Sequence, residues 1–197
     1  MFNKPLTINK NGSQIALSYG SDLARYKQVR TVQEAGQSKT ITTHYIGKHY
    51  EVEFESAAGG TQQTRKSYLG DVAIFTDSDQ DGTDIAYTHR DRLGSATTFT
   101  DHNNQVTARR FFDPFGKPRN GDWSPIENLT TNATLGNNLL DSKMSTRRGF
   151  TDHEHLDEAE IIHMNGRVYD YNVGRFMSVD PVIQSPTNTQ SVNPYSY

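Results

Sequence analysis

The sequence has no cysteine, only one tryptophan and no long apolar run. Without cysteine the chain forms no disulfide and offers no thiolate as nucleophile or metal ligand. The absence of cysteine does not indicate whether the chain works in an oxidising or a reducing compartment. No apolar run approaches the roughly 18 residues that a membrane-spanning helix needs, so no membrane span is expected. The first ten residues lack an apolar core, so we expect no Sec signal in this chain.

An excess of charge of one sign is also lacking, since 20 basic residues stand against 23 acidic ones and the net charge is -3. This balance gives no broad electrostatic basis for binding nucleic acid, so no nucleic-acid partner is expected. No Gly-rich phosphate loop precedes a helix, and no Ser-His-Asp arrangement stands out. We therefore predict no cofactor.

What the sequence does contain is aromatic residues, with ten Tyr and nine Phe in a chain that is only 33% hydrophobic. The mean hydropathy of -0.77 is low for a thick core. A thin, curved sheet with one solvent-facing side explains this combination best. The 197 residues suffice for one sizeable domain or two small ones.

Short alternating segments predict a series of β-hairpins. Tyr50, Val52 and Phe54 alternate with glutamates, which predicts a strand with its glutamates toward water. Further strands are expected at the following places: residues 40–46 before a turn at Gly47-Lys48, 72–75, 85–89, 96–100 and 106–112. The acidic segment 77–83 resembles half of a calcium loop, but it lacks the required Glu and its flanks are strand-like. A solvated hairpin tip is the preferred interpretation.

A loose internal repeat underlies these hairpins. Asp91-x-x-Gly94 recurs as Asp113-x-x-Gly116, and Tyr169-Asp170 with Gly174 forms a longer copy. The aspartate is expected to accept hydrogen bonds from turn N–H groups, and the glycine to supply a positive φ. Such units cannot bury their aromatic residues alone, so they are expected to stack. A polar segment, residues 121–143, interrupts the pattern and predicts a long loop.

The segment from Gly149 to Pro181 carries the most specific signals. Thr151 and Glu154 form a capping-box pattern, which predicts a short helix near 151–159. Asn165-Gly166 between apolar segments predicts a tight hairpin that orients Arg167. An Asp-Pro pair, Asp180-Pro181, follows.

These residues resemble the Rhs repeat-associated core domain of bacterial polymorphic toxins and of the C subunit of insecticidal Tc toxin complexes. The resemblance spans roughly residues 85 to 197. The matching motifs are THRDRLGS at 88–95, FDPFG at 112–116, GFT at 149–151, HE at 153–154, NGRVYD at 165–170, GRF at 174–176, Ser178 and Asp180-Pro181. The resemblance implies an all-β fold of stacked antiparallel hairpins that form part of a hollow YD-repeat shell, with one short helical segment. It also implies three regions: YD-repeat hairpins over 1–120, a polar insertion over 121–148 and the core's C-terminal segment over 149–197.

The function that the resemblance implies is enclosure of a C-terminal toxin domain and its release by self-cleavage. Cleavage of the aspartic-protease type needs two carboxylates that share a proton. Asp180 matches the first family aspartate, and Arg167 matches the arginine beside the site. The second family aspartate lies beyond Tyr197, so we expect this chain alone not to cleave. Asp152 and Tyr171 depart from the family pattern, which bears on local geometry.

The implied partners are the toxin domain and the rest of the shell of the parent protein, with secretion machinery as a further partner. The implied location is outside a bacterial cell after export, with a cytoplasmic stage before it. Pairing of open sheet edges predicts a homodimer of the isolated chain.

Two alternatives stay open. In the first, the chain is a β-rich adhesion or ligand-binding module without catalytic activity, which contacts its partner through the loop at 121–143. In the second, it is a hydrolase acting in trans, which requires a carboxylate near Asp180, with Asp170 the best candidate and Asp152 another. A metal site at His153, His155, Asp157 and His163 is disfavoured because no four-ligand spacing emerges. Hydrogen bonding is the expected role of His153 and Glu154, and no metal is predicted.

Overall fold

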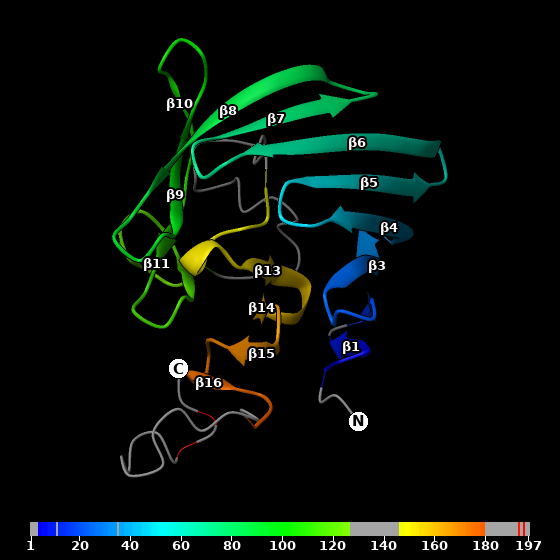
Figure 1. Ribbon diagram of the computed structural model, residues 1–197, viewed down its shortest axis with the longest axis vertical. Coiled ribbons are helices and arrows are strands. Elements are labelled where there is room, and N and C mark those ends of the chain that lie inside the picture. The colour runs from blue at the N-terminus through cyan, green and yellow to red at the C-terminus, as the bar shows by residue number, and fades with distance from the viewer. Residues whose placement is uncertain are drawn as a thin grey trace.

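The protein is almost entirely antiparallel β-structure, as predicted (Figure 1). The computed structural model describes residues 4–10, 12–34, 36–126 and 146–179, together with Asn193 and Tyr195. Ten strands form one sheet in strict sequence order, which we call the wall: β1 Thr7–Lys10, β2 Ser13–Tyr19, β3 Arg25–Glu34, β4 Gln37–Ile46, β5 Tyr50–Ala57, β6 Gly60–Leu69, β7 Ala73–Ser78, β8 Gly82–Arg90, β9 Ala96–Thr100 and β10 Val106–Arg109. No helix in the described part of the chain is long and apolar enough to cross a membrane.

A second sheet of four short strands lies in the hollow of the curved wall (Figure 1). We call residues 146–179, which contain this sheet, the plug. Its strands are β13 Glu154–Leu156, β14 Ile161–Met164, β15 Arg167–Asp170 and β16 Arg175–Phe176. A small hairpin, β11 Phe111–Phe112 with β12 Pro118–Arg119, lies between wall and plug in the sequence.

The predicted hairpins are present. Strand β4 ends at Ile46 and β5 begins at Tyr50, so the turn falls at Gly47-Lys48. The acidic segment joins β7 to β8 as a hairpin tip, where Arg65 contacts Asp77 at 3.1 Å. The predicted strand at 106–112 is divided at Arg110 into β10 and β11.

The repeated Asp-x-x-Gly element forms one recurring five-residue turn. Asp91 Oδ1 accepts hydrogen bonds from the N–H groups of Leu93 and Ser95, both at 2.8 Å, and Gly94 N–H donates to the Asp91 carbonyl. Asp113 repeats this arrangement. Gly94 and Gly116 have φ values of +83° and +84°, which only glycine adopts readily. The roles predicted for aspartate and glycine are confirmed.

Gly116 differs from Gly94 in its surroundings, which gives a testable prediction. A Cβ at Gly116 would lie 2.6 Å from Phe150 Cδ1, whereas a Cβ at Gly94 would meet nothing within 4 Å. Gly116→Ala is expected to lower the free energy of unfolding by about 2–3 kcal/mol, since overpacking adds to the backbone strain. Gly94→Ala is expected to cost only the strain, about 1 kcal/mol. Urea unfolding of both variants measures the difference; equal losses would contradict the close packing of plug on turn.

The short helical segment predicted near 151–159 consists of two single 3₁₀ turns, Phe150–Asp152 and Asp157–Ala159, on either side of β13. The predicted capping box is wrong. Thr151 has φ +47° and lies inside the first 3₁₀ turn, whose N-cap is Gly149, and Glu154 belongs to a strand. Two consecutive residues with positive φ, Thr151 and Asp152, prevent a right-handed helix here.

One side of β5 was predicted wrongly. Glu51 is only 8% exposed, while Tyr50 and Phe54 are half-buried. The Glu51 carboxylate accepts a hydrogen bond from the Tyr68 hydroxyl. That hydroxyl also lies 2.8 Å from Thr146 Oγ1 at the start of the plug. Alternation locates the two faces of a strand but does not say which one is covered. Here the plug covers the glutamate face.

Within the described ranges, three hydrophobic clusters hold these layers together. One joins β2 to the plug through Ile15, Leu17, Leu156, Ile161 and Val168. A second joins the plug to β11, and a third lies within β6–β10 of the wall. Because each cluster is small, polar contacts carry much of the junction between wall and plug.

Candidate functional site

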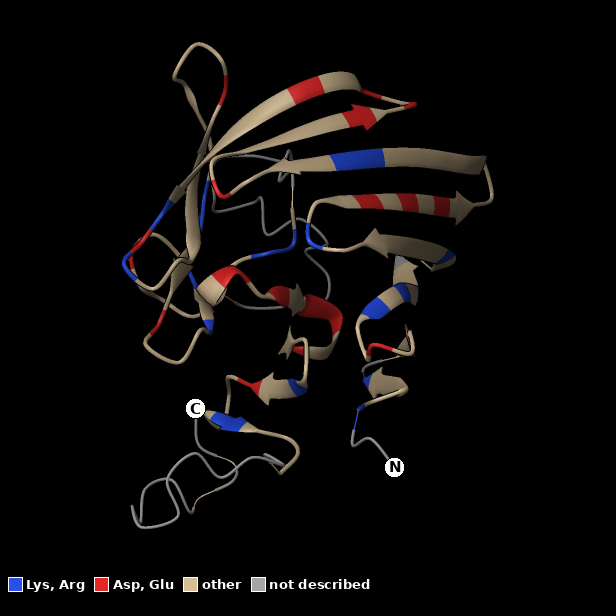
Figure 2. Ribbon diagram, viewed as in Figure 1, with Lys and Arg blue, Asp and Glu red and all other residues tan. Residues whose placement is uncertain are grey.

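The junction of wall and plug contains a network of buried charges. Basic residues of β3 face acidic residues of the plug, and the acidic plug segment and the basic bands of β3 are visible in Figure 2. Burial strengthens each interaction because the effective dielectric constant is low. Removing one partner would leave the other charge buried and uncompensated, so the pairs that cross the junction hold the plug against the wall. We call this network the latch; it consists of Arg25, Arg30, Glu53, Arg147, Glu154, Asp157 and Glu158.

Glu154 is the centre of this latch. Its carboxylate pairs with Arg25 of β3 and accepts hydrogen bonds from the Tyr45 hydroxyl of β4 at 3.0 and 3.1 Å. Burial by itself raises the pKa of Glu154, but Arg25 and Arg147 outweigh it and lower that pKa to about 2. Glu154 is therefore ionised at every physiological pH. Its predicted hydrogen-bonding role is confirmed.

A second set of ion pairs lies beside it. Arg30 of β3 reaches Glu158 of the plug at 2.8 Å and Glu53 of β5 at 3.2 Å. Arg147 contacts Glu158 at 2.7 Å and Asp157 at 3.3 Å. These cations lower the pKa of Glu158 against the raising effect of burial, whereas burial dominates at Asp157 and raises its pKa. One glutamate thus connects both arginines, and through them β3, β5 and the plug.

The histidines once considered as metal ligands are engaged in hydrogen bonds instead. His155 Nε2 accepts the Phe150 N–H at 3.1 Å, His163 Nε2 lies 3.0 Å from the Tyr19 hydroxyl, and His153 Nδ1 lies 3.0 Å from Thr151 Oγ1. Burial lowers the pKa of His163 to about 3 and that of His155 well below its usual value. Both buried imidazoles are therefore neutral. Within the described residues, no group of three or more His, Asp or Glu side chains is arranged to hold a metal.

The predicted arginine lies on the plug. Arg167 begins β15 after the Asn165-Gly166 turn, and its guanidinium stacks on the Phe176 ring of β16 at 3.6 Å. Asn165 has φ +52°, consistent with the predicted hairpin. Asp180, the predicted catalytic aspartate, lies outside the described residues.

The other aspartates considered as its partners are used in local structure. Asp152 pairs with Arg90 of the wall at 2.8 Å. Asp170 Oδ1 accepts the Asn172 N–H at 2.8 Å, so it shapes the turn before β16.

Sequence reasoning missed the latch. Arg25 and Arg30 lie more than a hundred positions from their partners in the plug, at separations of 129 and 128 residues. No local pattern connects them. The one available signal was the density of acids at 154–160 after the basic pair Arg147-Arg148, which indicated a charged segment but not its partner.

We compared the sequence and the fold with those of known proteins. No family model matches the sequence, and no curated protein matches it. Solved structures do match. The crystal structure of TcdB2-TccC3 shares 15% identity over 96% of this chain with a TM-score of 0.71, and the crystal structure of TcdB2-TccC3-Cdc42 shares 14% over 96% with a TM-score of 0.71. The fold is that of Tc toxin chains.

A third match is the Tc holotoxin pore of Photorhabdus luminescens, at 16% identity over 96% of this chain with a TM-score of 0.65. At these identities the similarity is one of fold. This chain spans only 8–9% of the length of the chains that it matches. The Tc-toxin-like fold agrees with the wall of hairpins expected from the sequence.

Proposed function

We propose that this chain is part of the wall of a YD-repeat shell that encloses a C-terminal toxin domain, with the plug closing the shell from inside. The observation that carries this proposal is the Tc-toxin-like fold, with a TM-score of 0.71, together with a plug fixed in the hollow of the wall by buried ion pairs. A latch of this kind holds two layers in one register without a thick hydrophobic core. The partners of the chain are then the toxin domain and the remaining shell.

The finer proposal is self-cleavage of the longer protein. Asp180 acts as the base that takes a proton from water, and a second carboxylate from another part of the protein gives a proton to the leaving amine. The water oxygen bonds to the carbonyl carbon and the C–N bond breaks. Arg167 would orient a carboxylate or stabilise developing negative charge. Support comes from its place on β15, held against Phe176 four residues before Asp180.

Processing of the full-length protein tests this assignment. Asp180→Asn is expected to abolish release of the C-terminal fragment, since the carboxamide cannot act as a base, and Arg167→Ala to slow it about 10-fold or more. Asp170→Asn is the matched control, because Asp170 serves a turn, and near-normal processing is expected. Fragment release is followed over time on denaturing gels. Normal processing in Asp180→Asn, or its loss in Asp170→Asn alone, rejects the assignment.

The further proposal that the protein is exported from a bacterial cell, after a cytoplasmic stage, depends on the shell hypothesis.

The alternative function is an adhesion or ligand-binding module. Aromatic residues buried among strands, such as Tyr169 and Phe99, agree with the shell. An exposed aromatic groove beside β10 gives the alternative one specific point in its favour.

A further inference from the structure

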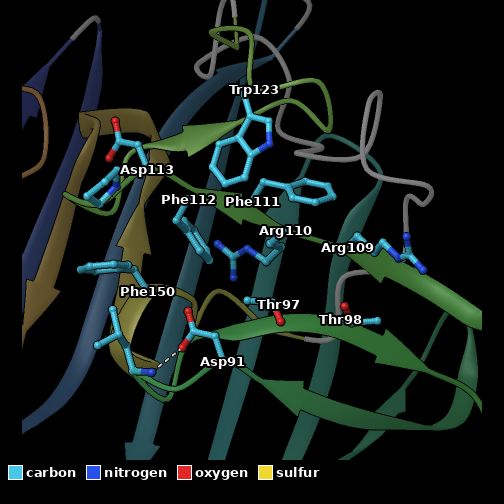
Figure 3. Close-up of a pocket in the computed structure, with 12 residues that line it drawn as sticks. Asp91, Thr97, Thr98, Arg109, Arg110, Phe111, Phe112, Asp113, Trp123 and Phe150 are labelled. Carbon is cyan, nitrogen blue, oxygen red and sulfur yellow. Dashed lines mark hydrogen bonds between the residues drawn. The ribbon is translucent and has the colours of Figure 1, made fainter.

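A groove of about 460 Å³ opens where the wall ends and the β11–β12 hairpin begins (Figure 3). Its sides include Phe111 and Phe112 of β11, Trp123, and Phe150 of the plug. The volume lies within the range of roughly 300–1,000 Å³ that is usual for binding pockets. None of the latch residues Arg25, Arg30, Arg147, Glu154 and Glu158 lines this groove.

Trp123 is held in a strained and exposed position. Its side chain is 62% exposed, and its φ of +68° is one that bulky residues rarely adopt. The Phe111 ring contacts the indole edge-on, with centroids 6.3 Å apart. The Trp123 N–H donates to the Asn120 carbonyl at 2.9 Å, so Trp123 takes the position that Gly94 has in the recurring five-residue turn. Figure 3 shows the indole beside Phe111 at the groove.

The charged side chains that line the groove differ in how many hydrogen-bond partners they have. Asp91 and Asp113 use Oδ1 within their own turns, and Asp113 Oδ2 also pairs with Arg119 at 2.9 Å. Arg110 is 2% exposed; its Nη1 donates to the Arg148 carbonyl, but its Nη2 has no acceptor among the described residues. A buried donor without an acceptor is costly. The Arg110 guanidinium therefore lacks one hydrogen-bond acceptor, and a carboxylate is the strongest acceptor for it.

The backbone next to the groove is also incomplete. Among the strands that the structure describes, β10 is the last of the ten-stranded sheet and pairs with β9 alone. Its outer edge can receive an extended peptide, which is a common recognition mode. Arg109 at the end of β10 is exposed and lines the groove, so it adds a positive charge at the rim.

We propose that this groove docks an extended polypeptide segment that carries an acidic residue next to an aromatic one. The aromatic ring of the segment lies against Trp123 and Phe111, and the carboxylate pairs with Arg109 and approaches Arg110. The backbone of the segment runs along β10. The inference is independent of self-cleavage and of the toxin.

The single tryptophan makes binding directly measurable, because all tryptophan emission comes from the groove. The chain is titrated with an acetylated, amidated peptide that contains aspartate followed by phenylalanine. A saturable blue shift of the emission is expected as the indole leaves water. The same peptide with asparagine in place of aspartate is expected to bind about 10-fold more weakly, since a charge-assisted hydrogen bond is lost. No saturation up to millimolar peptide, or equal binding of both peptides, overturns the proposal.

Phenylacetate serves as the small-molecule arm. It offers a ring and a carboxylate but no backbone for β10. Weaker binding than the peptide supports a polypeptide segment, whereas equal or tighter binding overturns it in favour of a small aromatic acid.

Two variants test the residues, with a fluorescently labelled peptide followed by anisotropy. Arg109→Gln is expected to weaken binding about 10-fold, and Arg92→Gln, an exposed arginine that does not line the groove, to leave it unchanged. Trp123→Asn is expected to weaken binding at least 10-fold without loss of thermal stability, because asparagine tolerates positive φ. Unchanged binding in Arg109→Gln or Trp123→Asn contradicts the assignment.

Discussion

Glu154→Gln is expected to lower the free energy of unfolding by about 3–5 kcal/mol. The carboxylate is the partner of Arg25 and Tyr45, and its removal leaves the Arg25 guanidinium buried without an opposite charge. Arg25 and Glu154 side chains are only 8% and 11% exposed, so solvent screens the pair weakly. Glutamine keeps the shape of the side chain, so the loss is electrostatic rather than steric. Equilibrium urea unfolding gives the value, with the slope checked for two-state behaviour.

Glu160→Gln is the matched control. It makes the same chemical change six residues away, but the Lys10–Glu160 pair is 36% and 31% exposed at its two side chains. Exposed pairs contribute at most about 1 kcal/mol. A loss in Glu154→Gln no larger than that in Glu160→Gln would show that the buried network does not hold the plug to the wall.

In the proposed full-length protein, Glu154→Gln also distinguishes loss of folding stability from opening of the plug. If the proposed shell encloses a segment and the latch fixes the plug, Glu154→Gln is expected to expose that segment to an added protease before the wall itself unfolds. Local opening is favoured where few apolar contacts support a polar junction. Digestion of the enclosed segment at unchanged rate, despite a measured loss of stability, would indicate that the plug does not close the shell.

The fold was predictable because its rules are local. The Asp-x-x-Gly turns depend on an aspartate that accepts N–H groups and on a residue with positive φ, and Asp91 with Gly94 shows this within five residues. Leu23 shows the limit of that rule. It has φ +63° at the position that Gly94 takes in its own turn, next to Asp22, and the glycine of this turn, Gly20, stands three residues earlier. Surrounding strands enforce the turn there, so a glycine search alone overlooks it.

The candidate site was less predictable because its contacts are distant in sequence. Nothing near Glu51 shows that a segment a hundred residues later covers it, so alternation predicted the wrong solvent-facing side. The capping box failed for a related reason. Glu154 is held in a strand by Arg25 and Tyr45, and these tertiary contacts outweigh a local helix signal. The hairpin that orients Arg167 was predicted well because Asn165-Gly166 determines it locally.

Acid is expected to loosen the same junction. Folding lowers the pKa of His163 from 6.5 to about 3, and lowers that of His155 well below 6.5. Below pH 6.5 the unfolded chain therefore binds protons that the folded chain does not, so stability falls as pH falls. At pH 5 His163 contributes a loss of about 2 kcal/mol relative to pH 7.5, and His155 adds a loss of the same sign. Urea unfolding at pH 7.5, 6.5, 5.5 and 5 measures the slope.

The surroundings of the two imidazoles explain why neither can accept a proton in place. Burial is the main cause at both, and the nearby cations are Arg25 and Lys4 at His163, and Arg110 and Arg147 at His155. Glu154 favours the charged form of His163 but is already paired with Arg25.

Other buried groups act with different signs. Glu154, with its pKa lowered to about 2, adds a loss of stability only below pH 4.5, whereas Glu51 and Asp157, with raised pKa values, oppose that loss as they take up protons. The interval from pH 7.5 to 5 therefore reports mainly on the histidines. His163→Asn is expected to reduce the slope over this interval by removing about 2 kcal/mol of the loss, while His102→Asn, in the exposed β9–β10 turn, leaves it unchanged. A flat stability profile in the unmodified chain would mean that these imidazoles are protonated in the folded state, and that the junction is more open to water than its burial indicates.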